Sequence, residues 1–338
     1  MLNIIKIKKT ITTYSNLNML LVCLCLSGCL KDDEPIKLES PKSGAQLAMV
    51  NIGADYKREI YFDLGTKDTL GSNVDGWDLA FECNANGTHI WINGGNGIKA
   101  SQTNYFNLND VHDTIGCNWK YDSPGWETDS TAFGQWSMPT GNPVYIIERS
   151  LVSPASPQDR FWKMTILQSN STAYTISYAR LTDTVSRILT LPKIANQNYT
   201  HFSFNNGGSM VSIEPDKQKW DIVFSRYRFI YHDFSPPLPY YVNGVLLNAH
   251  LTFAAVDSVT PYDSIHYAQA VNYTLKNKRD VIGFDWKIFN FTSQKYEVKP
   301  YYVYIIKDQE GYYYKLHFLS FYDPMGIAGA PAFEFHRL

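Results

Sequence analysis

The chain has 338 residues, 44% of them hydrophobic, and its 30 basic and 32 acidic side chains nearly cancel. This length provides for a buried core and for more than one domain. The near-neutral charge argues against nucleic acid as the main partner, because phosphate binding requires a basic surplus. Aromatic residues are abundant, with 24 Tyr, 18 Phe and 8 Trp, a composition that suits both sheet faces and ligand contacts.

The N-terminus has the pattern of a lipoprotein signal peptide. Three early lysines precede an apolar stretch at 19–26, which runs into Leu-Ser-Gly-Cys29. The stretch is too short for a membrane-spanning helix. We therefore expect a signal peptide at 1–28, cleavage before Cys29, acyl chains on its thiol, and a lipidated linker at 29–55. The acidic run at 32–34 resembles the surface-export signal of Bacteroidota lipoproteins, which predicts an outer-membrane protein exposed at the cell surface.

The remainder of the chain contains an internal duplication. Four segments recur in the same order: 76–81 with 219–224, 115–120 with 282–287, 144–148 with 303–307, and 161–167 with 313–319. The period is far longer than that of a solenoid repeat. We expect a first copy at 56–181, a connector at 182–198 and a second copy at 199–338.

Short strands dominate the pattern within each copy. Residues 174–178 alternate with period two, and 301–306 and 312–318 are aromatic runs separated by a loop that contains Gly311. Gly and Pro interrupt the chain too often for long helices. The sequence predicts an all-β protein of antiparallel sheets, with helix confined to short turns.

The repeated Trp-Asp pairs suggest structural roles. We expect Trp77 and Trp220 to pack in the core, and Asp78 and Asp221 to bind backbone amides at a strand bend. Cys83 and Cys117 remain after signal cleavage; they could form a disulfide or stay as free thiols, and the sequence leaves both open.

Four segments of the second copy carry a family resemblance. They are W-D-I-V-F-S-R-Y at 220–227, Y-Y-V-N-G-V-L-L-N at 240–248, I-G-F-D-W-K at 282–287 and the aromatic run at 303–322. Together they resemble the HmuY family over about 200–338. The first copy looks like a more diverged version of the same module.

The resemblance implies a function as well as a fold. Members of the HmuY family are all-β lipoproteins of Bacteroidota that capture haem at the cell surface and work with a TonB-dependent outer-membrane transporter. Some hold haem between two histidines, relatives use methionines, and others bind cobamides. The implied ligand is therefore a tetrapyrrole, with haem as the first expectation and a cobamide as the alternative.

The elaborated part of the second copy is where we look for ligands. Trp220 and Trp286 are 66 residues apart, against 42 between Trp77 and Trp119, and loops added to a rigid sheet often carry binding sites. Haem iron takes imidazole or thioether ligands. The candidates are His232 and His266 as the metal-binding pair, His250 in reserve, Met325 as a thioether, and Tyr240 and Tyr241 as stacking residues.

The sequence also bears on two other classes of function, enzymes and structural surface proteins. The chain has no nucleophile elbow, zinc-protease motif or phosphate-binding loop, so we expect a binding protein rather than an enzyme. A structural or adhesive surface protein without a small ligand remains an alternative.

Overall fold

The computed structural model describes residues 44–137, 141–149 and 157–338. The predicted signal peptide and Cys29 lie outside the described residues. The prediction of an all-β, antiparallel protein is confirmed, because twenty strands account for nearly all regular structure in the described part of the chain. The one α-helix there is the short α2 (Tyr267–Ala270), and the other helical elements are single 3-10 turns.

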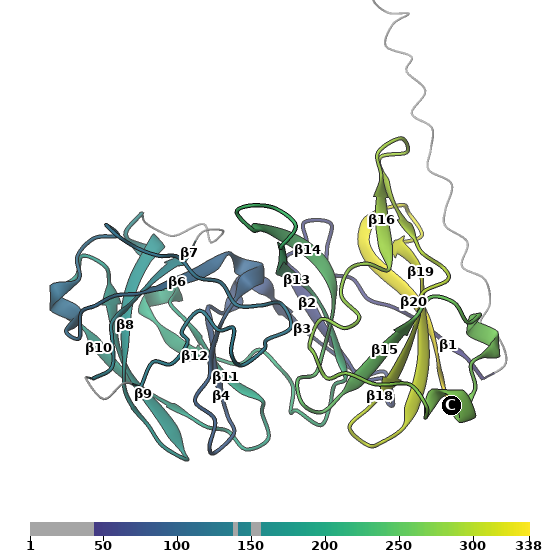
Figure 1. Ribbon diagram of the computed structural model, residues 1–338, viewed down its shortest axis with the longest axis horizontal. Coiled ribbons are helices and arrows are strands. Elements are labelled where there is room, and N and C mark those ends of the chain that lie inside the picture. The colour runs from purple at the N-terminus through teal and green to yellow at the C-terminus, as the bar shows by residue number, and fades with distance from the viewer. Residues whose placement is uncertain (1–43, 138–140, 150–156) are drawn as a thin grey trace, which may run out of the picture.

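The strands form two units along the long axis of the molecule (Figure 1). What we name the N-terminal unit contains a five-stranded sheet, in the order β10(Arg187–Pro192), β9(Ala173–Arg180), β8(Phe161–Ser169), β7(Tyr145–Arg149), β6(Ile98–Gln102). Its second sheet has four strands, in the order β12(Ser209–Val211), β11(Tyr199–Ser203), β4(Leu79–Glu82), β5(Ile90–Ile92).

The C-terminal unit repeats this plan. Its five-stranded sheet has the order β1(Gln46–Met49), β20(Ala328–Arg337), β19(Tyr313–Tyr322), β18(Val303–Lys307), β15(Phe253–Asp257). Its four-stranded sheet has the order β3(Thr69–Asn73), β2(Arg58–Phe62), β13(Ile222–Tyr231), β14(Leu238–Leu247). A separate two-stranded hairpin, β16(Lys287–Asn290) and β17(Lys295–Val298), is added to this unit.

The two copies in the sequence exchange strands. Strands β1 to β3 precede the first Trp-Asp pair, yet β2 pairs with β13 and β1 with β20. In the same way, β10 to β12 precede the second Trp-Asp pair, yet β11 pairs with β4 and β10 with β9. The repeat boundaries expected at 56–181 and 199–338 therefore describe the order of the sequence. They differ from the two spatial units, each of which takes two strands from the other copy and one from the segment that precedes that pair, β1 from the linker and β10 from the connector.

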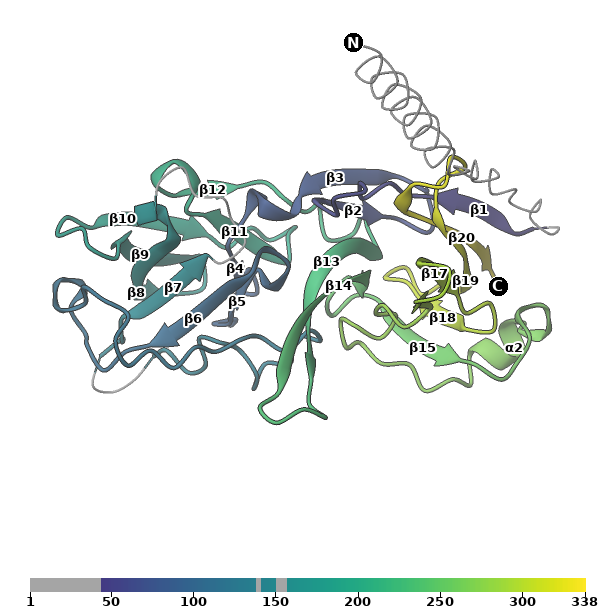
Figure 2. The ribbon, with the colours of Figure 1, turned by 90° about the horizontal axis from the view of Figure 1, so that it is seen from above.

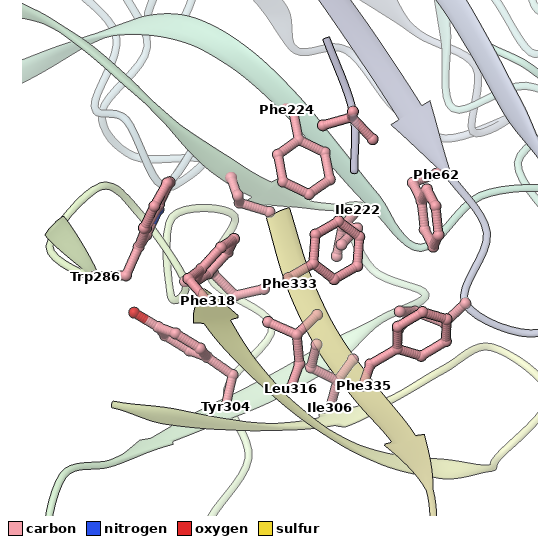
Figure 3. Packing of buried hydrophobic residues seen from close by; sticks show 14 of the residues in the cluster. Phe62, Ile222, Phe224, Trp286, Tyr304, Ile306, Leu316, Phe318, Phe333 and Phe335 are labelled. Carbon is pink, nitrogen blue, oxygen red and sulfur yellow. The ribbon is translucent and has the colours of Figure 1, made fainter. Parts of the chain in front are cut away.

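Three hydrophobic clusters hold the layers together. One lies between the sheets of each unit; Figure 3 shows that of the C-terminal unit, where Phe224 stacks on Phe333 with ring centroids 5.3 Å apart. The third cluster joins residues of the two four-stranded sheets, among them Tyr61, Trp91 and Trp220. The units thus share a buried interface as well as exchanged strands.

The Trp-Asp pairs fix the backbone in the same way in both units. The Asp78 carboxylate accepts the Phe204 N–H at 2.7 Å, and the Asp221 carboxylate accepts the Leu64 N–H at 2.8 Å. Trp77 and Trp220 are both buried. These structural roles were predicted correctly, and in each case the carboxylate caps a strand supplied by the other copy.

One of the four sequence matches is wrong as a structural equivalence. Ile115 is 89% exposed, whereas Ile282 is 2% exposed. Lys120 pairs with Ala100 of β6. Strand β15 corresponds to β6, but its residue Ala254 pairs with Lys276 and not with Lys287, which the sequence match aligns with Lys120. The excursions from the two sheets, 103–144 and 258–302, are similar in length but follow different paths. Cys83 and Cys117 carry free thiols.

Candidate ligand-binding surface

An extended arm distinguishes the C-terminal unit. Strand β13 pairs with β14 over ten residues, from Ile222 to Tyr231, but with β2 only as far as Phe224. Beyond Phe224 the two strands therefore leave the sheet as a two-stranded arm (Figure 2). The β16–β17 hairpin is a second projection of the same unit, at the top of Figure 1.

Aromatic side chains gather on these two hairpins. We name the following set the hairpin surface: Tyr231, Phe234, Tyr240 and Tyr241 on the arm, and Phe291 and Tyr296 on β16–β17. Phe234 and Tyr240 are each 56% exposed, and Phe291 is 81% exposed. Exposure of several large rings in one region is unusual for a soluble surface and is typical of a binding site.

The two parts of the hairpin surface approach one another. Tyr231 contacts both Phe234 and Tyr240, at centroid distances of 6.2 and 6.1 Å. Burial raises the pKa of Tyr296, and the phenols of Tyr240 and Tyr322 raise it further. Phe229, lower on the arm, packs on Phe284 at 5.1 Å, in the segment that leads to β16.

The base of the arm is anchored on the N-terminal unit. The Arg226 guanidinium donates to the Gly95 carbonyl at 2.7 Å, and the Arg228 guanidinium donates to the Ile98 carbonyl at 2.7 Å. A Cβ on Gly95 would lie 2.0 Å from the Arg226 carbonyl oxygen, so only glycine fits there. Arg228 also lies between the rings of Tyr121 and Tyr241, 4.5 and 5.7 Å from their centroids.

The structure does not bring the predicted histidine pair together. His232 is exposed in the turn of the arm, between β13 and β14, and so belongs to the region of Tyr240 and Tyr241. His266 is exposed immediately before α2, which lies at the far end of the unit from the arm (Figure 2). Their role as ligands stays a prediction, but two facing imidazoles are not what this arrangement presents.

The other two predicted ligands lie in separate places. His250 has φ 67° and lines a depression of about 500 Å³ between the units, together with Cys83, Lys193 and Lys217. Met325 is 74% exposed in the β19–β20 turn, where its N–H bonds the Asp323 carboxylate at 2.9 Å. Tyr322, at the end of β19, accepts the Tyr296 N–H at 2.6 Å, so this turn begins beside the β16–β17 hairpin.

Among the remaining histidines, two have structural contacts. His317 stacks on Tyr262, with ring centroids 4.0 Å apart. His201 is buried against Trp77 at 4.9 Å, and burial, together with the Arg279 charge, lowers its pKa to about 3.

Sequence reasoning missed His89. It lies beside Glu82 across the short β4–β5 hairpin, with Nδ1 2.8 Å from the Glu82 carboxylate, and lines a cavity of about 500 Å³. The signal was present: Phe81 pairs with Ile90, so the next residues outward, Glu82 and His89, must face each other.

No helix in the described part of the chain is long and apolar enough to cross a membrane. The predicted attachment through lipid on Cys29 lies outside the described residues and stays a prediction.

Comparison with known proteins gives one sequence match and several weak structural ones. The HmuY protein family model matches residues 241–335, and no curated protein matches the chain. Among solved structures, apo PinO from "Porphyromonas gingivitis" has 11% identity, covers 87% of this chain and 97% of its own, and has a TM-score of 0.28. The apo HmuY analog of Tannerella forsythia has 10% identity, with 89% and 97% covered and a TM-score of 0.25.

A third structure, described as a putative HmuY-like heme binding protein from Bacteroides vulgatus, has 9% identity, with 90% and 97% covered and a TM-score of 0.23. Similarities of this strength do not establish a shared arrangement of the two units. The family match stands on its own, and the resemblance predicted from the sequence is confirmed where it applies: residues 241–335 of the C-terminal unit are similar to the HmuY family.

Proposed function

We propose that this protein binds haem or a related tetrapyrrole on the hairpin surface and passes it to a TonB-dependent transporter of the outer membrane. The observation that carries the proposal is the extent of the family match. Residues 241–335 include most of β14, which carries Tyr241, and the whole of β16–β17, which carries Phe291 and Tyr296.

The chemistry of the surface suits a broad planar ligand. Tyr240 and Tyr241 lie on opposite faces of the arm, and each offers an aromatic ring on which a macrocycle could stack, with a hydroxyl group that can face water. His232, in the turn of the same arm, is the imidazole that we propose as an axial ligand of haem iron. Met325 is the thioether candidate, in the β19–β20 turn, which begins beside Tyr296.

We also propose that the protein is held at the outer membrane by acyl chains on Cys29. Each buried CH₂ group of such a chain contributes about 0.8 kcal/mol to membrane binding. Cys29 precedes the first strand, β1(Gln46–Met49), in the sequence, so the proposed anchor is joined to the sheets from their N-terminal end. A tether of this kind leaves the projecting hairpins accessible to a transporter in the same membrane.

The test is an absorbance titration of the purified mature chain with ferric haem. We expect binding to shift and sharpen the Soret band, and His232→Ala to change its position because an axial ligand is lost. Tyr240→Ala should weaken binding roughly tenfold through loss of stacking. Tyr267→Ala is the matched control, since Tyr267 is also 56% exposed but lies on α2, away from the arm.

A Soret band that does not respond to haem, or that responds identically in wild type, His232→Ala and Tyr240→Ala, would refute haem binding at this surface. Titration of the same variants with a cobamide distinguishes this alternative ligand from haem. A corrinoid carries its own lower ligand, so a cobamide should be weakened by Tyr240→Ala and unaffected by His232→Ala.

A further inference from the structure

A small cavity lies between the two units, beside the base of the arm. Its volume is about 40 Å³, which is room for a few water molecules or one small ion, since a single water needs about 10–15 Å³ of such space. Three arginines line it: Arg226 and Arg228 from β13, and Arg279 from the excursion between β15 and β18. The carboxyl groups of Glu59, on β2, and Asp122, between β6 and β7, line it as well. Charged side chains from both units therefore meet at this cavity.

Both carboxyl groups are already engaged in other hydrogen bonds. The two oxygens of Asp122 accept the backbone N–H groups of Ile92 and Ala132, each at 2.6 Å. One oxygen of Glu59 accepts the Trp77 indole N–H at 3.2 Å, and each of its oxygens accepts a serine hydroxyl. Burial also raises the pKa of Asp122 to about 7, so this group carries only part of a negative charge at neutral pH.

The three guanidinium groups lack counter-charges in direct contact. In the part of the chain that the structure describes, none of them forms an ion pair with a carboxylate. Arg226 and Arg228 donate to backbone carbonyls, and the Nε–H of Arg279 is buried without an acceptor. Arg228 is only 4% exposed. Because a buried charge without a counter-charge is costly, this cavity is where a compensating negative charge would stabilise the fold most.

Arg279 is held in place by both units. Its guanidinium lies over the Trp126 indole, 3.8 Å from the ring centroid, and its backbone N–H donates to the Gly125 carbonyl at 3.3 Å. Both of these residues belong to the N-terminal unit. Its own carbonyl accepts the N–H of Leu247, on β14, at 2.7 Å. The unsatisfied Nε–H is therefore part of a fixed structure at the interface between the units.

We propose that this cavity binds one small inorganic anion, of the size of chloride, and that Arg226, Arg228 and Arg279 hold it jointly. The volume excludes an organic anion, and a halide accepts N–H donors from several directions without the planar geometry that a carboxylate requires. The anion supplies the counter-charge that the carboxyl groups do not, and it connects the base of the arm to the excursion that carries Arg279. Its binding does not require a ligand on the hairpin surface.

The test is thermal unfolding of the mature chain in sodium chloride and in sodium gluconate at equal concentration. The two salts screen charges to the same extent, but gluconate is too large for the cavity. An anion that binds only the folded protein stabilises it by mass action. When chloride is tenfold above its dissociation constant, we expect Tm to be about 2–4 °C higher in chloride than in gluconate. Broadening of the chlorine NMR line of chloride by the folded protein measures the binding directly.

Variants of Arg279 locate the site. Arg279→Met should abolish both the chloride-dependent part of Tm and the line broadening, because the guanidinium with the unsatisfied N–H is removed. Arg279→Lys keeps the positive charge without Nε, and we expect chloride to bind it more weakly than wild type but more tightly than Arg279→Met. The matched control is Arg337→Met, because Arg337 also lies over an aromatic ring, 3.3 Å from the Tyr312 centroid, but is on β20 and does not line the cavity.

The expected result is a chlorine line that wild type and Arg337→Met broaden and Arg279→Met does not, whether or not haem shifts the Soret band. Equal Tm values in the two salts, together with an unbroadened chlorine line in wild type, would overturn the anion site. Chloride effects of the same size in wild type, Arg279→Met and Arg337→Met would also overturn it, because chloride would then act elsewhere on the protein.

Discussion

The two units share a scaffold and differ in what they attach to it. Both have five- and four-stranded sheets of the same order, and the longest pair in each five-stranded sheet has a register shift at the same place, between Ile166 and Gln168 and between Phe318 and Ser320. The hairpins of the four-stranded sheets are unlike: β4 and β5 have four and three residues, whereas β13 and β14 have ten each. The repeated features therefore belong to the sheets that both units share. The β13–β14 hairpin, which differs between the units, carries exposed aromatic side chains.

A second difference lies in the buried carboxylates that cap the exchanged strands. Asp78 forms an ion pair with Arg149, at 3.0 Å, in which both side chains are almost completely buried. Asp221 accepts only the Leu64 N–H and the Thr252 hydroxyl, and burial raises its pKa to about 7. Burial raises the pKa of both carboxyl groups, but only at Asp78 does a guanidinium in contact, that of Arg149, oppose the rise.

The largest effect on the free energy of unfolding should come from replacing the buried aspartate of each unit by asparagine, one unit at a time. Asp78→Asn leaves the buried Arg149 charge without its partner, which typically costs about 3–5 kcal/mol. Asp221→Asn keeps an amide oxygen for the Leu64 N–H and should cost about 1 kcal/mol or less at neutral pH. Urea unfolding followed by tryptophan fluorescence measures both free energies of unfolding.

The double variant Asp78→Asn/Arg149→Met is the control, since removing both charges should recover part of the loss. Equal costs for the two single substitutions would contradict the contrast between the carboxylates.

A smaller effect should come from the contact that anchors the arm on the N-terminal unit. Gly95→Ala would place a Cβ 2.0 Å from the Arg226 backbone oxygen, and overpacking of this kind costs about 1–3 kcal/mol. Gly71→Ala is the control, because its nearest neighbour is the end of the flexible Arg58 side chain at 3.0 Å. Thermal unfolding compares the two, and a Gly95→Ala protein as stable as Gly71→Ala would show that the units are not held at this contact.

Much of the sheet scaffold could be predicted from local sequence patterns. Alternation and turn residues predicted the antiparallel strands, and the Trp-Asp repeats predicted the capping carboxylates. The exchange of strands could not be predicted in this way, because β2 and β11 would complete a sheet equally well beside the Trp-Asp strand of either copy. Long-range packing decides which strands pair. Because both copies have the same alternating pattern, the sequence does not distinguish between the two possible partners.

The candidate site divides in the same way. Tyr240 and Tyr241 were found because added length and aromatic content point to an elaborated loop. The histidine pair was chosen by loop position alone, and sequence position gives no information about whether His232 and His266 face each other. His89 was overlooked although its cross-strand relation to Glu82 follows from the register of a hairpin, since that hairpin was not itself predicted.

The effect that is smallest per pH unit is the pH dependence of stability in the C-terminal unit. The Asp221 pKa is raised by burial from 3.8 to about 7, so between those values the folded protein keeps a proton that the unfolded chain releases. Stability from this group is full below about pH 4 and is lost as the pH rises toward 7, with a slope of less than about 1.4 kcal/mol per pH unit. Burial also raises the pKa values of Asp122 and Glu214 to about 7, which adds a slope of the same sign.

Asp221→Asn should remove the Asp221 share of this slope and leave the rest. Urea unfolding of wild type and Asp221→Asn at several pH values between 4.5 and 7.5 measures it, and the difference between the two free energies should shift in favour of the variant as the pH rises. If the two curves run parallel, Asp221 is ionised throughout that range. Asp221 would then be stabilised in its ionised form without an arginine partner, and the hydrogen bond from the Leu64 backbone N–H would have to provide that stabilisation.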